Sequence, residues 1–124
     1  MVALALAVRL AYLGGYRATP FFADPQGEAL YQDRWALQIA QGDLLGQEVF
    51  FRPPLNAYLL AALGRLTHHS YMALRVAQAF LGAFACLLVF RIGRRLFGPG
   101  VALSAGLLAA FLAGNIYYEA ELLV

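Results

Sequence analysis

The feature that most constrains this chain is a run of 18 residues, Val101 to Tyr118, that contains no charged side chain. At a helical rise of 1.5 Å per residue this run reaches about 27 Å, which is close to the hydrocarbon thickness of a bilayer. Two other blocks, residues 1–16 and 71–90, are also apolar and long enough to be candidate transmembrane helices. We therefore predict an all-α membrane protein with about three transmembrane helices.

The composition favours lipid over water as the surroundings. Apolar residues make up 62% of the chain and charged residues 13%, whereas an ordinary soluble domain has about 25% charged residues. Nine arginines and seven acids are too few and too scattered to form a nucleic-acid interface. The single cysteine, Cys86, excludes an internal disulfide.

Residues 17–70 lie between the first two predicted spans, and we expect them to form a loop outside the lipid. Asp24 and Pro25 suit the N-cap and the first position of a helix that would end near Gln41. A second helical block, residues 55–66, is too short for a span and is expected to be juxtamembrane or re-entrant.

The first helix of this loop has an amphipathic pattern. Tyr31, Trp35 and Ile39 recur every four residues, and most positions between them are polar. This spacing is typical of a helix that lies at a membrane interface, where Trp and Tyr suit the headgroup level.

The arginines predict which side of the membrane the loop occupies. Arg91, Arg94 and Arg95 fall in the short turn expected between the second and third spans, and the seven acids lie toward the other side. The positive-inside rule then places this turn in the cytoplasm and the 17–70 loop outside it. We expect a multi-pass protein of a bacterial inner or plasma membrane. Because the chain ends within the apolar stretch 121–124, we expect it to be part of a longer protein.

Four stretches occur in a distinctive order and spacing, namely Glu28–Ala36, Ile39–Asp43, Phe51–Leu55 and Arg91–Gly98. Together they resemble the start of the polytopic GT-C glycosyltransferases, the protein mannosyltransferase and aminoarabinose transferase group classed as family 39 or family 83. The resemblance implies an inverting enzyme that moves a sugar from a polyprenyl-phosphate-linked donor to an unidentified acceptor on the extracytoplasmic side. It also implies that residues 1–124 are the N-terminal part of a GT-C transmembrane domain, inactive when alone.

Sugar transfer of this kind needs a base for the acceptor hydroxyl and cations for the departing phosphate. The resemblance makes Glu28 the candidate catalytic base, with Asp33 next, and matches Glu119 to a second acid of the family. Glu28 and Asp33 are about 140° apart on a helix, so they cannot act as a pair on one face. Each acid also has a plain structural interpretation, which for Glu28 is a solvated residue at a helix N-terminus.

Candidate substrate-binding residues are Arg52, Arg75 and Tyr31. Arg52 precedes two prolines and could hold a donor phosphate with two hydrogen bonds, or it could extend from the interface into water. Arg75 is a possible lipid-phosphate contact for similar reasons, and Tyr31 stands where some members of the family carry a basic residue. Other members carry an acid where this chain has Phe51, so the sequence gives no support for a divalent metal, and no cofactor is expected.

Two other functions fit the sequence. A transporter or flippase-like protein would use the intramembrane charges of Arg9 and Arg75 to line a substrate path. Alternatively, the outer loop could be merely structural. In each interpretation Arg9 should face other helices or a polar cavity, the bilayer is a partner and nucleic acid is not.

Overall fold

The computed structural model describes residues 1–24, 26–45, 54–68 and 70–121. Within these ranges the regular elements are helices, which confirms the all-helical prediction for the described part of the chain. They are α1 (Val2–Tyr16), the 3-10 helix η1 (Pro20–Phe22), α2 (Glu28–Ala40), α3 (Leu55–Thr67), α4 (Tyr71–Phe97), α5 (Pro99–Phe111) and α6 (Ala113–Ala120).

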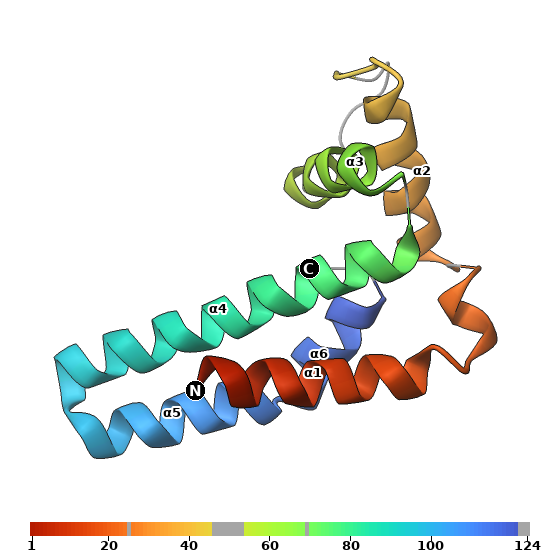
Figure 1. Cartoon of the computed structure of the whole chain (residues 1–124). Helices are drawn as coiled ribbons and strands as arrows, with labels where there is room; N and C mark the ends of the chain where they lie inside the picture. The colour runs from red at the N-terminus through yellow and green to blue at the C-terminus, as the bar shows by residue number, and fades with distance from the viewer. Residues whose placement is uncertain (25, 46–53, 69, 122–124) are drawn as a thin grey trace.

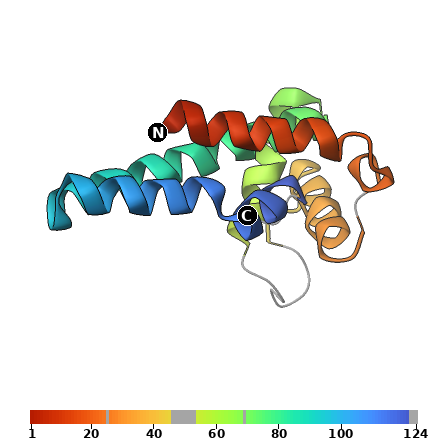
Figure 2. The ribbon, with the colours of Figure 1, turned by 90° about the horizontal axis from the view of Figure 1, so that it is seen from below.

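The helices form a long bundle with a helical hairpin at one end. Helices α1, α4 and α5 lie alongside one another, and α2 and α3 pack together across the end where α4 begins (Figure 1). The view from below again shows the three long helices side by side (Figure 2). The first loop of the sequence is therefore a folded unit placed at one end of an apolar bundle.

Small side chains let the long helices approach closely. Ala5 on α1, Ala83 and Cys86 on α4, and Ala110 on α5 form one buried cluster. Farther along, a Cβ atom added to Gly93 of α4 would lie 3.1 Å from the Cα atom of Ala102 on α5. Close backbone packing of this kind is common between helices in membranes, where lipid removes the hydrophobic drive for association.

Helix length and composition test the predicted number of membrane spans. Among the described residues, α4 is long and apolar enough to cross a membrane by itself, with 27 residues. Helices α5 and α6 qualify only as a pair, which is bent by 42° at Leu112, and α1 is a shorter apolar helix of 15 residues. Among the described residues, one helix is therefore long and apolar enough to be a membrane span, or two if the bent pair counts as one span. The predicted count of about three spans is not confirmed.

The predicted bounds of the turn between the second and third spans were wrong. Helix α4 continues to Phe97, so the three arginines expected in a turn lie on its last turns instead. Gly98 alone makes the connection to α5, with a φ of +90° that glycine adopts easily, and Pro99 then begins the next helix. The third block is interrupted because Leu112 is extended, with a ψ of 101°.

The predicted start of α2 was also wrong. The helix begins at Glu28 with Gly27 as its N-cap, and Gly27 has a φ of +60°. Asp24 therefore lies in the preceding turn, and Pro25 lies outside the described residues. The predicted end holds, since Ala40 is the last helical residue and Gln41 caps it.

The apolar face of α2 packs on protein rather than facing a membrane interface. Trp35 and Ile39 are buried with Leu60 of α3 and Leu74 of α4. Tyr31 alone of the predicted interfacial residues stays well exposed. This burial explains why α2 and α3 form a hairpin and why the hairpin is attached to the start of α4.

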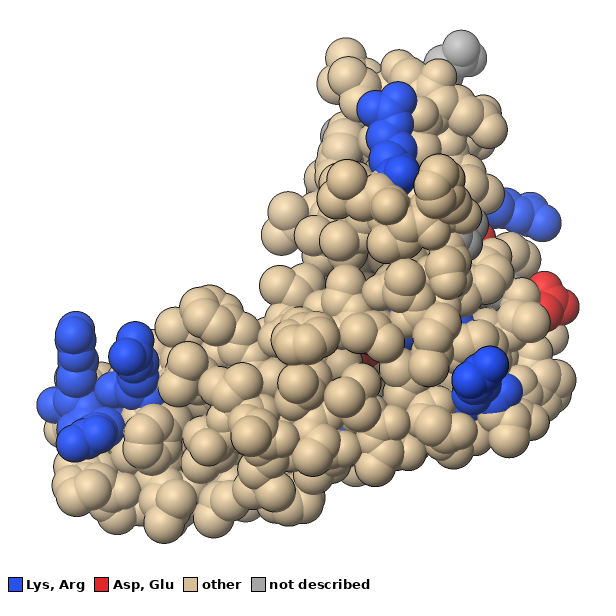
Figure 3. Space-filling view, in the orientation of Figure 1, with Lys and Arg blue, Asp and Glu red and all other residues tan. Residues whose placement is uncertain are grey.

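The surface of the bundle is apolar along most of its length. Phe80, Phe84, Leu88 and Ile92 recur every four residues on α4 and are exposed. Figure 3 shows few charges over this middle part, with basic side chains at both ends and acidic ones toward the hairpin end. A continuous apolar belt of this kind is expected to face lipid or another apolar surface.

Candidate functional site

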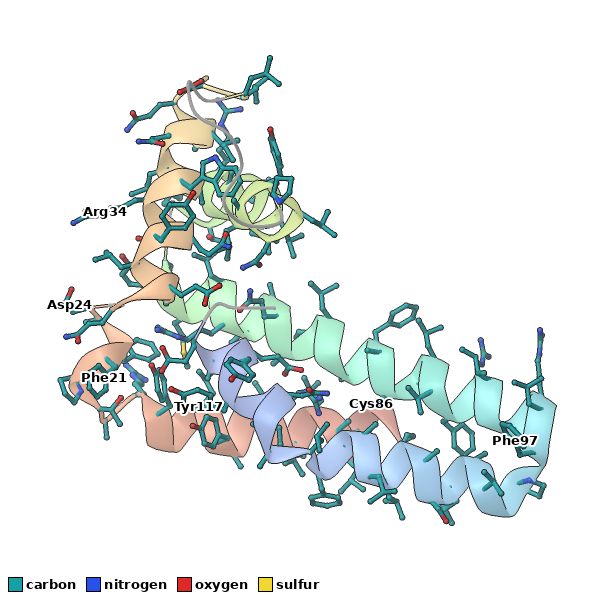
Figure 4. The ribbon with its side chains drawn as sticks, turned by 180° about the vertical axis from the view of Figure 1, so that it is seen from behind. Phe21, Asp24, Arg34, Cys86, Phe97 and Tyr117 are labelled. Carbon is teal, nitrogen blue, oxygen red and sulfur yellow. The ribbon has the colours of Figure 1, made fainter. Side chains whose placement is uncertain are left out.

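Buried polar groups gather at the end of the bundle that carries the hairpin. Figure 4 shows Phe21 and Tyr117 near this end and Phe97 at the opposite one. The central group is the guanidinium of Arg75, a residue that is only 2% exposed. Its Nε donates to the carbonyl of Ala120 at 2.6 Å, and its Nη1 donates to the carbonyl of Phe22 at 2.6 Å.

Three aromatic rings surround the same guanidinium. Its central carbon lies 4.4 Å from the ring centroid of Phe22, 5.2 Å from that of Tyr16 and 5.7 Å from that of Tyr71. Aromatic faces attract cations, and they do so more strongly where water is excluded. The rings and the two carbonyls together explain how a charge can be buried at this position.

The two tyrosines extend the cluster to acidic side chains. The hydroxyl of Tyr71 donates to Oδ2 of Asp33 on α2 at 3.0 Å, and the hydroxyl of Tyr16 donates to Oε1 of Glu121 at 2.6 Å. Tyr71 and Arg75 are four residues apart and share a face of α4. This Arg75 cluster, made of Arg75, Tyr16, Phe22, Tyr71, Asp33 and Glu121, links α1, α2, α4 and the end of α6.

A second polar group lies deeper in the bundle. Arg9 donates from Nε to Oε2 of Glu119 at 2.7 Å and from Nη2 to Oε1 at 3.2 Å, so the pair is joined by two hydrogen bonds. Nη1 of Arg9 also reaches the carbonyls of Ala5 at 3.2 Å and Ala110 at 3.4 Å. A small pocket lies between this pair and Arg75, with Tyr12 and Ile116 in its walls.

The catalytic candidates from the first loop lie in different surroundings. Glu28 is exposed on the first turn of α2, whereas Asp33 is 3% exposed and faces α4. The two acids are thus on different faces of the helix, as their spacing predicts. Tyr31 is exposed next to Trp35, with ring centroids 5.9 Å apart, and Arg52 lies outside the described residues.

Glu119 and Glu121 differ from expectation in one respect. Residues that are two apart on a helix normally point to different faces. Both nevertheless bind residues of α1, Arg9 and Tyr16. Glu121 is the residue that caps α6.

Sequence reasoning missed several residues of this region. It did not single out Tyr16, Tyr71 or Gly82, nor the hydrogen bond at 3.4 Å between the buried amides of Gln78 and Asn56. One signal was available, because charges inside apolar segments usually pair with one another. Arg9 lies in the first predicted span and Glu119 directly follows the third, and the prediction that Arg9 faces other helices or a polar cavity is confirmed.

No group of three or more His, Cys, Asp or Glu side chains that could hold a metal ion occurs in the part of the chain that the structure describes. The carboxylates of the region are instead bonded to Arg or Tyr, as in the Glu119 and Asp33 contacts.

Comparison with known proteins identifies a family. The family model described as dolichyl-phosphate-mannose-protein mannosyltransferase matches residues 51–121, which include α3 to α6 and the positions of Arg52, Arg75 and Glu119. No curated protein and no solved structure matches the chain. Because the match covers more than half of the 124 residues, the chain belongs to the dolichyl-phosphate-mannose-protein mannosyltransferase family.

Proposed function

We propose that this protein is a membrane glycosyltransferase that moves a sugar from a polyprenyl-phosphate-linked donor to an acceptor, with inversion at the anomeric carbon. The observation that carries the proposal is the family match over residues 51–121. The arrangement of the molecule supports it, because polar groups gather at one end of a bundle whose sides are apolar (Figure 3). A lipid-linked donor needs this combination, with its chain along the apolar belt and its phosphate at the polar end.

The donor phosphate is the group for which we propose arginine contacts. Arg75 borders the pocket at the hairpin end of the bundle, and Arg52 precedes the start of α3. A guanidinium can bind phosphate oxygens with two hydrogen bonds and stabilise the charge that develops as the phosphate leaves. Tyr31, exposed on α2, is the third residue that we assign to substrate binding.

We assign the role of general base to Glu28. It is exposed on the first turn of α2, so an acceptor hydroxyl can approach it from outside the bundle. Asp33 and Glu119 are the other candidates, but each carboxylate is buried and bonded, to Tyr71 and to Arg9 respectively. A base that must meet a soluble or bulky acceptor is best placed where the acceptor can reach it.

Charge distribution supports an extracytoplasmic site in a plasma or bacterial inner membrane. The exposed Arg91, Arg94 and Arg95 lie at the end of the bundle opposite the hairpin (Figure 3). Arg17, Arg34 and Arg65 are spread over the hairpin end, whereas these three arginines fall within five residues, and under the positive-inside rule we place this denser end in the cytoplasm. The hairpin, Glu28 and the Arg75 cluster then lie on the other side of the membrane.

A transporter or flippase-like function is the second candidate, and one observation favours it. Helices α5 and α6 form a broken pair with a 42° bend, and discontinuous helices often form the binding sites of secondary transporters. The two functions are separated by their products. A transferase makes a new glycosidic bond from a polyprenyl-phosphate sugar, whereas a transporter or flippase returns its substrate unchanged.

The substitution Glu28→Gln tests the proposed base. It preserves size and hydrogen bonding but cannot accept a proton, so the complete protein should bind the lipid-linked donor normally and turn over about 10² to 10⁴ times more slowly. Sugar transfer is measured at saturating polyprenyl-phosphate sugar, and donor binding is measured separately. Glu28→Asp should keep part of the activity, because a carboxylate remains.

Matched variants decide which acid is the base. Asp33→Asn and Asp24→Asn are compared with Glu28→Gln under the same conditions. If Glu28→Gln turns over at a near-normal rate and Asp33→Asn loses most of its activity, the general base is Asp33 on the buried face of α2. Absence of any transferred sugar with the unsubstituted protein would reject the glycosyltransferase proposal itself.

A further inference from the structure

The Arg9–Glu119 pair connects α1 to both halves of the broken helix. Arg9 binds the side chain of Glu119 on α6 and the backbone carbonyl of Ala110 on α5. Ala110 lies in the last turn of α5, where carbonyl groups have no partner within the helix. One guanidinium therefore bonds on both sides of the bend at Leu112.

A glycine on α4 makes room for this pair. A Cβ atom added to Gly82 would overlap Oε1 of Glu119 and would lie 2.6 Å from Nε of Arg9. Both charged groups would have to move, although each is the far end of a flexible side chain. The pair thus sits directly on the backbone of α4, at a position where a side chain would push it apart.

The other end of α6 is held by the second buried arginine. Arg75 binds the carbonyl of Ala120, and Tyr16 binds Glu121 in the next position. Tyr71, whose ring lies near the Arg75 guanidinium, binds Asp33 of α2. The bend between α5 and α6 therefore determines where the end of α6 meets the cluster beneath α2.

We propose that Arg9 and Glu119 are a positioning pair, seated on Gly82, which holds α6 at the angle that the transfer reaction needs. This inference rests on the proposed glycosyltransferase function and deepens it, since it gives Glu119 a role other than that of the base. Neither residue touches the reacting atoms in this role. Their effect reaches the site through α6, Arg75 and Tyr71.

A double-mutant cycle tests the pair in the complete protein. Arg9→Gln and Glu119→Gln each leave one uncompensated buried charge, and each should lower kcat by about 10²-fold through a misplaced α6, with little change in the KM for donor. The double variant Arg9→Gln with Glu119→Gln buries no charge and should recover most of the loss. If Glu119 were the base, the double variant would stay as inactive as Glu119→Gln, and the proposal would be overturned.

A distance measurement tests the same proposal without activity. In a Cys86→Ala background, spin labels at the exposed positions 101 and 118 report the angle between α5 and α6. Their distance distribution should broaden in Arg9→Gln and in Gly82→Ala. It should stay unchanged in Gly14→Ala, a matched control in which the added Cβ meets nothing within 4 Å.

The two measurements separate failure of this proposal from failure of the proposed function. If the unsubstituted protein transfers no sugar, the function is wrong, but the spin-label distances still test whether the pair holds the bend. If the distribution in Arg9→Gln equals that of the parent, the pair does not set the position of α6, whatever the activity.

Discussion

Burial of an arginine guanidinium in an apolar bundle is costly unless partners replace water, and both buried arginines here have several. Arg75 reaches the carbonyls of Phe22 and Ala120, which are 53 and 45 residues away in the sequence. A planar guanidinium with donors in fixed directions can serve two such acceptors at once, whereas a lysine ammonium is a single compact charge. These contacts explain why arginine, and not lysine, occupies this position.

Replacement of Tyr71 by Phe isolates one bond of the cluster. The variant keeps the ring beside Arg75 but removes the hydroxyl that donates to Asp33. A hydrogen bond to a charged group contributes about 1.5 to 3 kcal/mol, so the free energy of unfolding should fall by about that amount. Unfolding of the complete protein in detergent micelles measures the change.

Tyr117→Phe is the matched control for that substitution. Tyr117 is exposed on α6, so this variant should unfold with nearly the free energy of the unsubstituted protein. Equal stability of the Tyr71→Phe variant and the unsubstituted protein would mean that the bond to Asp33 contributes nothing to the fold.

At the scale of elements, the hairpin of α4 and α5 depends on backbone contact. Gly93 lies against the Cα atom of Ala102, which belongs to the backbone and cannot rotate away. Small residues at such crossings replace the larger interlocking side chains of soluble bundles. The single-residue connection at Gly98 requires this closeness, because it leaves the two helices no slack.

Gly93→Leu should therefore push α4 and α5 apart. Overpacking typically costs about 1 to 3 kcal/mol, which outweighs the roughly 1 kcal/mol gained when glycine is replaced inside a helix. Gly100→Leu places the same side chain in open space on α5 and is the control. The thermal midpoint of unfolding in detergent should drop for the first variant only. A similar midpoint for both would show that the contact at Ala102 yields easily.

The sequence predicted elements better than it predicted their ends and partners. Apolar blocks gave the approximate places of α1, α4 and α5 with α6, since hydrophobic length is a local property. The predicted helix limits failed at Gly27, at Phe97 and at Leu112, where turn conformation or tertiary contacts decide where a helix begins or ends. Burial of Trp35 against α3 also depends on a contact between distant segments.

The candidate site was predictable only in part for the same reason. Asp33, Arg75 and Glu119 could be named from residue type and resemblance. Their partners could not be assigned, because the bond between Arg9 and Glu119 joins residues 110 positions apart. The tyrosines of the Arg75 cluster carry no charge and have no distinctive spacing, so nothing in the sequence singled them out.

For the whole molecule, the main feature is that exposed charges gather at the two ends of the bundle and leave its middle apolar. Figure 3 shows basic side chains at both ends and acidic ones toward the hairpin, and the exposed arginines are Arg91, Arg94 and Arg95 next to the α4–α5 connection and Arg17, Arg34 and Arg65 outside it. Helix α4 connects these ends, and its 27 residues extend about 40 Å, which exceeds the hydrocarbon thickness of a bilayer. The molecule therefore has the charge distribution of a protein whose middle lies in a membrane.

Topology gives the last prediction, since α4 should place the hairpin and the α4–α5 connection on opposite sides of the membrane. In a Cys86→Ala background, single cysteines at Asp43, near the end of α2, and at Gly98 are treated in intact cells with a thiol reagent that cannot cross the membrane. Asp43→Cys should react from outside, and Gly98→Cys only after the membrane is permeabilised. Labelling of both from outside would mean that α4 does not cross, and the apolar belt would then need protein rather than lipid to cover it. Labelling of Gly98→Cys alone would keep the span but reverse its direction, and the proposed extracytoplasmic site would move to the cytoplasmic side.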